Sequence, residues 1–299
     1  MKHGVAPVPA SGEGAESSTL AATAELGLPE FRAIAAIMME DARIHLVESK
    51  IVLVHSRLSR RLRDHGLTRF SDYVALVRRD ATERAAMVVA LTTNHTHFFR
   101  EDHHFDHLRR HVLPQLQASA RARKPVRIWS AGCSSGEEVY SIAMCLAGDG
   151  TASASWLRQG DVKLLATDIS PPVVESVAKG VYSASTVQPI PAAYRDRWLR
   201  PQGSDFVVAD ELRELVTARV LNLFDRWPMR QQYDVIFCRN VMIYFDDKAK
   251  AELEARFVEM LAPGGHLYIG HSERLIGPAA AAMESVGQTI YVKAGGGSR

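Results

Sequence analysis

The sequence predicts an α/β domain with a parallel, doubly wound sheet, preceded by a small all-α domain. Residues 28–91 carry apolar residues at helical spacing without a strand-like run. After residue 125, short apolar runs typical of buried strands alternate with helical segments. With 299 residues, 46% of them hydrophobic, the chain is long enough to bury two separate cores.

The all-α domain is expected over residues 27–92, after a flexible tail over residues 1–26. The tail is rich in Ala, Ser, Gly, Glu and Pro and lacks apolar periodicity. A first helix is predicted to begin at Leu28-Pro29-Glu30, where proline suits the first turn. His65-Gly66 is predicted to end the second helix. Helices two to four are predicted around residues 51–62, 70–77 and 82–91.

Residues 93–125 are expected to form a linker and a linker helix, and residues 126–299 the α/β domain. Residues 181–219 interrupt the alternation of strands and helices, which predicts an insertion with a small antiparallel hairpin. A late helix with Leu253 and Phe257 on one face is expected to end at Pro263-Gly264-Gly265. Strands are predicted at residues 126–129, 162–168, 220–223, 233–240, 266–270 and 289–293, and earlier helices at 137–146 and 171–179.

The loop after the first predicted strand, residues 131–138, is the strongest local signal of a ligand site. Ligands of an open α/β sheet bind beyond the carboxyl ends of its strands. Gly132 and Gly136 allow a tight turn and a close approach of the ligand. Glu137 and Glu138 would repel a pyrophosphate at the start of the next helix, but they suit a cofactor that carries an ammonium group. A plain strand–helix turn remains an alternative for this loop.

Asp168 ends the second predicted strand, where an acidic side chain can accept both hydroxyls of a ribose. This feature suits NAD and S-adenosylmethionine equally. The dinucleotide fingerprint GxGxxG is absent from the loop, however, so an NAD-dependent dehydrogenase is the least favoured of the enzyme classes.

Four further motifs, in chain order, carry a resemblance to a known family. They are LTTNHTHFFRE at residues 91–101, NLFD at 222–225, FCRNVMIYF at 237–245 and PGGHLYIGHSE at 263–273. Together with the glycine loop they closely resemble the chemotaxis receptor glutamate O-methyltransferases, the CheR family, over residues 30–293. The resemblance implies a Rossmann-like S-adenosylmethionine methyltransferase domain with a small β-subdomain insertion, preceded by a small all-α domain.

The resemblance also implies S-adenosyl-L-methionine as the cofactor and S-adenosyl-L-homocysteine as the product. It implies Arg100 and Tyr244 as catalytic residues, and a guanidinium such as that of Arg100 can grip a carboxylate bidentately. No metal site is expected, because the twelve histidines include no HExxH or Cys/His zinc spacing. The implied cofactor-binding residues are Asn94, Thr96, Arg100, Glu137, Asp168, Asn222, Leu223, Arg239 and Asn240.

The implied partner is the cytoplasmic methylation region of chemoreceptors, with the chain acting in the cytoplasm as a monomer. A formal net charge of +2 does not point to nucleic acid, no apolar run is long enough to span a bilayer, and we expect no insertion into a membrane. The basic run Arg57, Arg60, Arg61 and Arg63 is either a solvated face or a receptor-docking face. Some members of the family bind a short peptide at the receptor C-terminus through the β-subdomain. The segment from Pro201 to Asp210 is short compared with those members, so we expect no such tether in this chain.

Other interpretations stay open at this point. The catalytic core alone does not exclude a methyltransferase with another substrate, or a non-catalytic sensor that binds S-adenosylmethionine. Cys133 and Cys238 are expected to be small buried hydrophobic residues, and the three cysteines suit a reducing cytosol. The rings of Phe98 and Phe99 either pack the linker onto the sheet or contact the cofactor.

Overall fold

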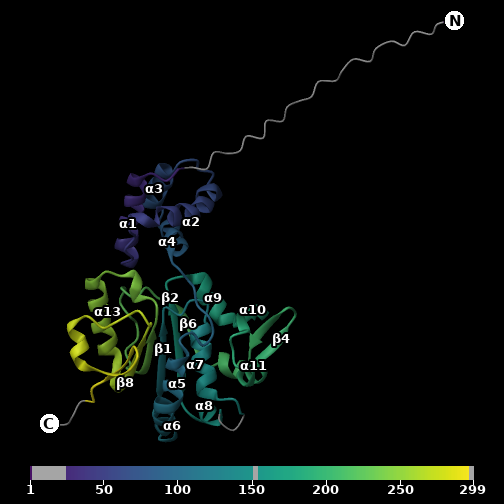
Figure 1. Cartoon of the computed structure of the whole chain (residues 1–299), viewed down its shortest axis with the longest axis vertical. Coiled ribbons are helices and arrows are strands. Elements are labelled where there is room, and N and C mark those ends of the chain that lie inside the picture. The colour runs from purple at the N-terminus through teal and green to yellow at the C-terminus, as the bar shows by residue number, and fades with distance from the viewer. Residues whose placement is uncertain (2–24, 151–153, 296–299) are drawn as a thin grey trace.

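The computed structural model describes residues 1, 25–150 and 154–295, and most of the predicted tail, residues 2–24, lies outside this part of the chain. A helical domain stands at one end of a larger α/β domain (Figure 1). A smaller unit with its own strands projects from one side of the α/β domain, opposite the side that carries the C-terminal strands.

Four helices form the N-terminal domain, as predicted. Their apolar stripes meet in a core that includes Phe31, Ile34, Leu58 and Met87. A short 3₁₀ turn, η1 (Glu48–Lys50), leads into the second helix. The helices are α1 (Leu28–Ala42), α2 (Ile51–Asp64), α3 (Phe70–Arg79) and α4 (Ala81–Leu91).

A buried carboxylate joins three helices of this domain. Glu83, in the first turn of α4, is 3% exposed. It accepts hydrogen bonds from Arg61 Nε at 2.6 Å, from the Tyr73 hydroxyl at 2.6 Å and from His65 Nε2 at 2.7 Å. Burial by itself raises the pKa of Glu83, but these hydrogen bonds outweigh burial and lower that pKa from 4.5 to about 2.

The linker leads into a continuous helical segment that contains a π-turn. Its parts are α5 (Asp102–His107), the π-turn η2 (Leu108–Val112) and α6 (Leu113–Arg121). Just before it, Phe98 packs edge-on against Tyr182 with the ring centroids 4.9 Å apart. Phe99 stacks on Tyr194 at 5.6 Å. Both phenylalanine rings therefore pack the linker against the α/β domain and its insertion.

The main sheet has seven strands in the order β6-β2-β1-β7-β8-β10-β9. Neighbours from β6 to β8 run parallel, whereas β10 is antiparallel to both β8 and β9. Successive residues of β7 alternate between two cores, with Val235 and Phe237 on one face and Ile236 on the other. The strands are β1 (Val126–Ala131), β2 (Val162–Asp168), β6 (Val216–Val220), β7 (Tyr233–Cys238), β8 (Leu261–Ile269), β9 (Met283–Gly287) and β10 (Ile290–Lys293).

Helices cover this sheet and confirm the predicted α/β fold class. Within the described residues, no helix is both long enough and apolar enough to cross a membrane. The helical elements of the α/β domain are α7 (Glu137–Ala147), α8 (Ser155–Gln159), α9 (Pro171–Lys179), η3 (Met242–Tyr244), α13 (Asp247–Met260) and η4 (Pro278–Ala282).

The third strand of the sheet and the end of the insertion differ from the sequence prediction. The strand is β6, residues 216–220, rather than residues 220–223, so the predicted insertion boundary at 219 is wrong. Residues 221–224 turn instead, because Asn222 Oδ1 accepts a hydrogen bond from the Phe224 amide at 3.1 Å. The edge strand was missed because it alternates apolar residues with Thr217 and Arg219 instead of forming an apolar run.

The insertion forms a three-stranded antiparallel sheet in the order β3-β5-β4. It therefore exceeds the predicted hairpin by one strand. Its strands are β3 (Val181–Ser183), β4 (Leu199–Gln202) and β5 (Asp205–Val208), and its helices are α10 (Ala184–Val187), α11 (Ala192–Trp198) and α12 (Asp210–Arg213).

The C-terminal part also departs from the prediction in two places. Helix α13 ends at Met260, and Pro263-Gly264-Gly265 lies within β8, which begins at Leu261. Strand β9 was not predicted, because its sequence Met-Glu-Ser-Val-Gly has low apolar content and lies at the sheet edge.

We predict that Glu83→Gln lowers the free energy of unfolding of the helical domain by about 2–3 kcal/mol at pH 7. Because the pKa of Glu83 is lower in the folded chain, its stabilising contribution is present above pH 4.5 and is lost as the pH falls towards 2. The difference between wild type and variant in urea denaturation should therefore shrink below pH 4.5.

The matched control is Glu48→Gln, which removes an exposed ion pair with Arg32. We expect this control to change stability by less than about 1 kcal/mol. Equal effects of the two substitutions at pH 7 would contradict the role assigned to the Glu83 cluster.

Candidate active site

A cavity of about 620 Å³ lies at the carboxyl ends of the parallel strands. The segments that follow four strands line it: Gly132–Ser134 after β1, Asp168–Ile169 at the end of β2, Leu221–Phe224 after β6 and Arg239–Val241 after β7. This is the edge where open α/β sheets bind their ligands. The volume falls within the range of about 300–1,000 Å³ typical of cofactor sites.

The helical domain supplies the opposite wall of this cavity. Residues 44–47, Lys50 and Leu53 line it from that side. Asn222 Nδ2 donates a hydrogen bond to the Asp41 carbonyl at 2.6 Å, and the His45 amide donates to the Tyr244 carbonyl at 3.0 Å. These hydrogen bonds join the helical domain to the α/β domain beside the cavity.

Both glycines of the β1–α7 loop are required by close packing. Gly132 has φ of 77°, and a Cβ there would lie 2.4 Å from Val241 Cγ2. Gly136 has φ of 99°, and a Cβ there would lie 2.7 Å from the Tyr182 hydroxyl. The tight turn between β1 and α7 therefore requires glycine at both positions. Gly132 also lines the cavity, so the same turn forms part of a ligand site.

The two glutamates at the start of α7 point in different directions. Glu138 lines the cavity, whereas Glu137 is not among the lining residues. The Glu137 carboxylate accepts a hydrogen bond from Ser135 Oγ at 2.7 Å. Glu138 accepts one from Ser130 Oγ at 2.7 Å, and burial raises the pKa of Glu138 although the charge of Arg239 opposes the shift. A turn of about 100° between successive helical residues separates the two side chains.

Asp168 lies on the cavity wall at the end of β2 and is 7% exposed. Its Oδ1 accepts a hydrogen bond from the Ser170 amide and its Oδ2 one from the Ser134 amide, each at 3.0 Å. Burial raises the pKa of Asp168, and the amide hydrogen bonds counteract that rise. These amides hold the carboxylate in one orientation, and each oxygen retains a lone pair for a ligand hydroxyl.

The linker segment passes along the cavity and contributes Asn94, Thr96 and Arg100 to its lining. The Asn94 carbonyl accepts a hydrogen bond from Ser134 Oγ at 2.9 Å, and Arg100 Nη1 donates to the His95 carbonyl at 3.0 Å. The residues on either side of Arg100, Phe99 and Glu101, have φ of 55° and 58°. Two non-glycine residues in the left-handed region so close together are a costly conformation, which is found preferentially at functional sites.

Arg239 lines the cavity and connects the linker, α7 and β7. Its guanidinium is 2% exposed and lies 3.3 Å from Glu138 Oε2 and 3.5 Å from Glu101 Oε2. Its Nη2 also donates a hydrogen bond to the Arg100 carbonyl. The side chain therefore holds the backbone of Arg100 in place.

Asn240 follows in a left-handed conformation, with φ of 58°. Its amide donates to Glu273 Oε2 at 3.1 Å, and its Nδ2 donates to Glu101 Oε1 at 3.3 Å. Glu273 also accepts hydrogen bonds from the amides of Gly270 and Ile243, at 2.5 and 3.2 Å. Glu273 thus fixes the loop after β7.

All of the predicted site residues except Glu137 line the cavity, and several further residues join them there. Sequence reasoning paired Glu138 with Glu137 as a partner of an ammonium group but named only Glu137 as a cofactor-binding residue. It assigned no role to Glu101 or Glu273, although both lie in the quoted motifs. Cys133 and Cys238 are buried, and burial raises the pKa of both thiols, as expected for hydrophobic packing rather than nucleophilic chemistry. The predicted residues that line the cavity are Asn94, Thr96, Arg100, Asp168, Asn222, Leu223, Arg239, Asn240 and Tyr244.

Comparison with protein families gives two matches that follow each other along the chain. Residues 29–92 match the model of the CheR methyltransferase all-alpha domain. Residues 94–292 match the model of the CheR methyltransferase SAM binding domain. The boundary between the matches falls at the start of the linker that lines the cavity.

Curated relatives cover nearly the same range. A probable chemotaxis protein methyltransferase of Rhizobium etli is 44% identical, over 85% of this chain and 96% of that protein. Chemotaxis protein methyltransferase 2 of Pseudomonas aeruginosa is 43% identical, over 83% of this chain and 87% of its own length. The chemotaxis protein methyltransferase of Escherichia coli is 38% identical, over 93% and 96%.

Three observations lead to the same family: the fold, the cavity at the carboxyl ends of the strands, and relatives that match along most of the chain. The chain belongs to the CheR methyltransferase family and is an S-adenosylmethionine-dependent enzyme.

Proposed function

We propose that this enzyme methylates glutamate side-chain carboxylates of chemoreceptors, giving methyl esters and S-adenosyl-L-homocysteine, in the adaptation of chemotaxis-type signalling. The observation that carries this proposal is the position of Arg100, a cation on the wall of a cavity whose remaining lining suits a nucleoside cofactor. The enzyme acts in the cytoplasm as a monomer on the receptor methylation region, without binding nucleic acid or inserting into a membrane.

Residues on the cavity wall suit S-adenosyl-L-methionine. Asp168 accepts the ribose hydroxyls, since its oxygens are held in place by backbone amides. Asn222 and Leu223 lie beside the adenine, and an acidic residue at the start of α7 meets the ammonium group. The structure favours Glu138 over Glu137 for this last role, because Glu138 lines the cavity. Asn94, Thr96, Arg239 and Asn240 complete the cofactor site.

When bound, the cofactor supplies a sulfonium methyl group, which passes to a carboxylate oxygen as the carbon–sulfur bond breaks. A free glutamate with a pKa of about 4.3 is already an anion at neutral pH, so no general base is required. Because the sulfonium carries its own positive charge, methyl transfer requires no metal. The task of the protein is to align the carboxylate and to exclude water.

Arg100 and Tyr244 are the residues that we propose for that alignment. Arg100 uses Nη1 for the His95 carbonyl, which leaves its other N–H groups for an incoming carboxylate. Tyr244 lines the same cavity from η3, and its backbone is held by His45 of the helical domain. We therefore assign Arg100 to binding the substrate carboxylate and Tyr244 to hydrogen bonding near the reacting centre.

The exposed face of α2 is the proposed receptor-docking surface. Two arginines of the basic run have structural partners: Arg57 donates to the carbonyls of Leu91 and Thr92, and Arg61 pairs with Glu83. Arg60 lies 3.9 Å from the Asp64 carboxylate but is exposed, and Arg63 is exposed as well. Lys50 at the start of the same helix lines the cavity, so the surface runs towards the site. We expect docking without a C-terminal tether.

The decisive experiment is transfer of labelled methyl groups from S-adenosylmethionine to receptor-containing membranes. Label that is released by mild base identifies a carboxyl methyl ester. Stable label on other acceptors would instead favour a methyltransferase with a different substrate. Cofactor binding by calorimetry without any methyl transfer would favour a sensor.

We predict that Arg100→Ala reduces methyl transfer by about 100-fold or more, because the carboxylate loses its cationic partner at the reacting centre. Arg100→Lys should restore part of the rate, since it keeps the charge without the bidentate geometry. The rate of base-labile labelling measures both effects, and Arg110→Ala, at an exposed arginine of η2, is the control. A wild-type rate for Arg100→Ala would refute the assignment.

We predict that Tyr244→Phe lowers the methyl-transfer rate constant about fivefold to tenfold, the effect of losing one hydrogen bond. Cofactor affinity in calorimetry should stay within about twofold, because the ring is retained. An unchanged rate constant, or a loss of affinity that accounts for the whole effect, would argue against a role at the reacting centre.

We predict that the double variant Arg60→Glu with Arg63→Glu weakens receptor methylation about tenfold at low salt, because it reverses the charge of the docking surface. Cofactor affinity should be unchanged. Arg121→Glu, at the far end of the linker helix, is the matched control. Equal loss of receptor methylation and cofactor binding would show that the double variant disrupts the fold, and would contradict a specific role of this surface in docking.

A further inference from the structure

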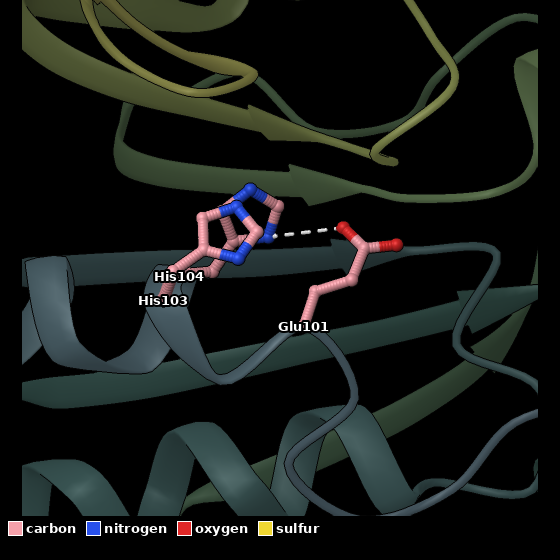
Figure 2. A group of neighbouring side chains, drawn as sticks. All are labelled: Glu101, His103 and His104. Atoms are coloured by element: carbon pink, nitrogen blue, oxygen red, sulfur yellow. Dashed lines mark ion pairs between the residues drawn. The ribbon is translucent and has the colours of Figure 1, made fainter.

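Three side chains at the start of α5 gather their potential metal-binding atoms in one place. One ligand atom from each of Glu101, His103 and His104 lies within 4.8 Å of the other two. Figure 2 shows the carboxylate of Glu101 turned towards the two imidazole rings. The ring centroids of His103 and His104 are 4.1 Å apart. No role in methyl transfer has been assigned to this group.

The hydrogen bonds of His104 determine which ring nitrogen carries the proton. His104 is fully buried, and its Nε2 lies 3.3 Å from the Gln288 carbonyl and 3.0 Å from Thr289 Oγ1. The Thr289 hydroxyl donates to the same Gln288 carbonyl at 2.7 Å. Because the carbonyl only accepts and the hydroxyl proton is used, Nε2 is the donor. In the neutral ring, Nδ1 is then an acceptor with a free lone pair.

This assignment leaves two acceptors facing each other in the protein interior. His104 Nδ1 lies 3.5 Å from Glu101 Oε2. Both atoms are buried, and neither has a hydrogen-bond partner among the described residues. Arg239 Nη2 lies 3.5 Å from Glu101 Oε2 and forms an ion pair with it, but among the described residues no donor faces His104 Nδ1. A buried acceptor that faces a carboxylate is unfavourable unless a cation lies between the two. Ligands bound at about 2.0–2.2 Å around a tetrahedral metal are separated by about 3.4 Å, which is close to the observed spacing.

The donor set points to a particular class of ion. Imidazole nitrogens together with a carboxylate suit Zn²⁺ and related transition metals, whereas Mg²⁺ and Ca²⁺ prefer oxygen ligands. His103 is half-buried, so the group can be reached from solvent. Three protein ligands would leave a fourth position for water.

We propose that Glu101, His103 and His104 bind one divalent transition-metal ion, Zn²⁺ by preference, as a structural site. The ion fixes the left-handed turn at Glu101, directly after Arg100, to the turn between β9 and β10 that holds Gln288 and Thr289. The proposal departs from the sequence-based expectation of no metal. The sequence did not reveal this site, because a glutamate followed two residues later by two adjacent histidines matches no standard metal-binding motif.

The guanidinium of Arg239 limits the affinity of this site. It lies 3.5 Å from Glu101 Oε2, so its charge repels a cation there. Glu138, 3.3 Å from Arg239, partly offsets that charge. We therefore expect weaker binding than in closed Cys/His zinc sites, whose ligands have no cationic neighbour.

The test titrates Co²⁺ by its absorption bands, and Zn²⁺ by calorimetry, into the full chain stripped of metal with a chelator. One equivalent should bind specifically and raise the melting temperature. His103→Ala, at the half-buried ligand, should weaken this binding by at least about tenfold while the metal-free variant stays folded by circular dichroism. His111→Ala, at an exposed histidine of η2, is the matched control and should bind like wild type.

Equal affinity of wild type and His103→Ala would place the ion at other histidines and overturn the proposal. No binding by wild type would overturn it as well, and would indicate the other tautomer of His104, with Nδ1–H donating to Glu101. Neither outcome bears on the proposed function, because methyl transfer is measured separately with the metal-free chain.

Discussion

The need to neutralise one buried guanidinium organises the site. Arg239 is almost completely removed from water, and a buried cation is stable only with charged or polar partners at close range. Those partners come from the linker and from α7, since Arg239 contacts the Arg100 carbonyl, Glu101 and Glu138. Satisfying this charge therefore brings three distant parts of the sequence to one edge of the sheet, where the cavity forms.

A second buried charge has a similar organising role in the helical domain. Arg61 forms an ion pair with Glu83, and Arg57 donates a hydrogen bond to a carbonyl at the end of α4, so both side chains point towards the domain. A basic run that looks uniform in the sequence is thereby divided into arginines that hold the domain together and arginines that face solvent. The proposed docking surface consists of Arg60 and Arg63. Its orientation is set by the contacts of Arg57 and Arg61, which fix α2 on the domain.

Features with a strong local signal were predictable from the sequence, and features set by distant contacts were not. Strand β2 matches its prediction at residues 162–168, because its apolar residues, Val162 and 164–166, are typical of a buried parallel strand. Edge strands β6 and β9 lack such a run. The choice between Glu137 and Glu138 depends on the rotation of α7 about its axis. The roles of Glu101 and Glu273 depend on contacts that span up to 170 and 33 residues, which no local pattern reveals.

The interdomain wall of the cavity links ligand affinity to domain cohesion. A molecule in the cavity touches both the helical domain and the ends of the strands, so part of its binding free energy opposes separation of the two domains. Conversely, a change that weakens the hydrogen bonds from Asn222 to Asp41 and from His45 to Tyr244 lowers ligand affinity to the extent that it depopulates the closed arrangement of the two domains. Under the proposed function, a receptor segment that binds the helical domain more tightly in the closed arrangement is thermodynamically coupled to cofactor occupancy, even where it touches no cofactor atom.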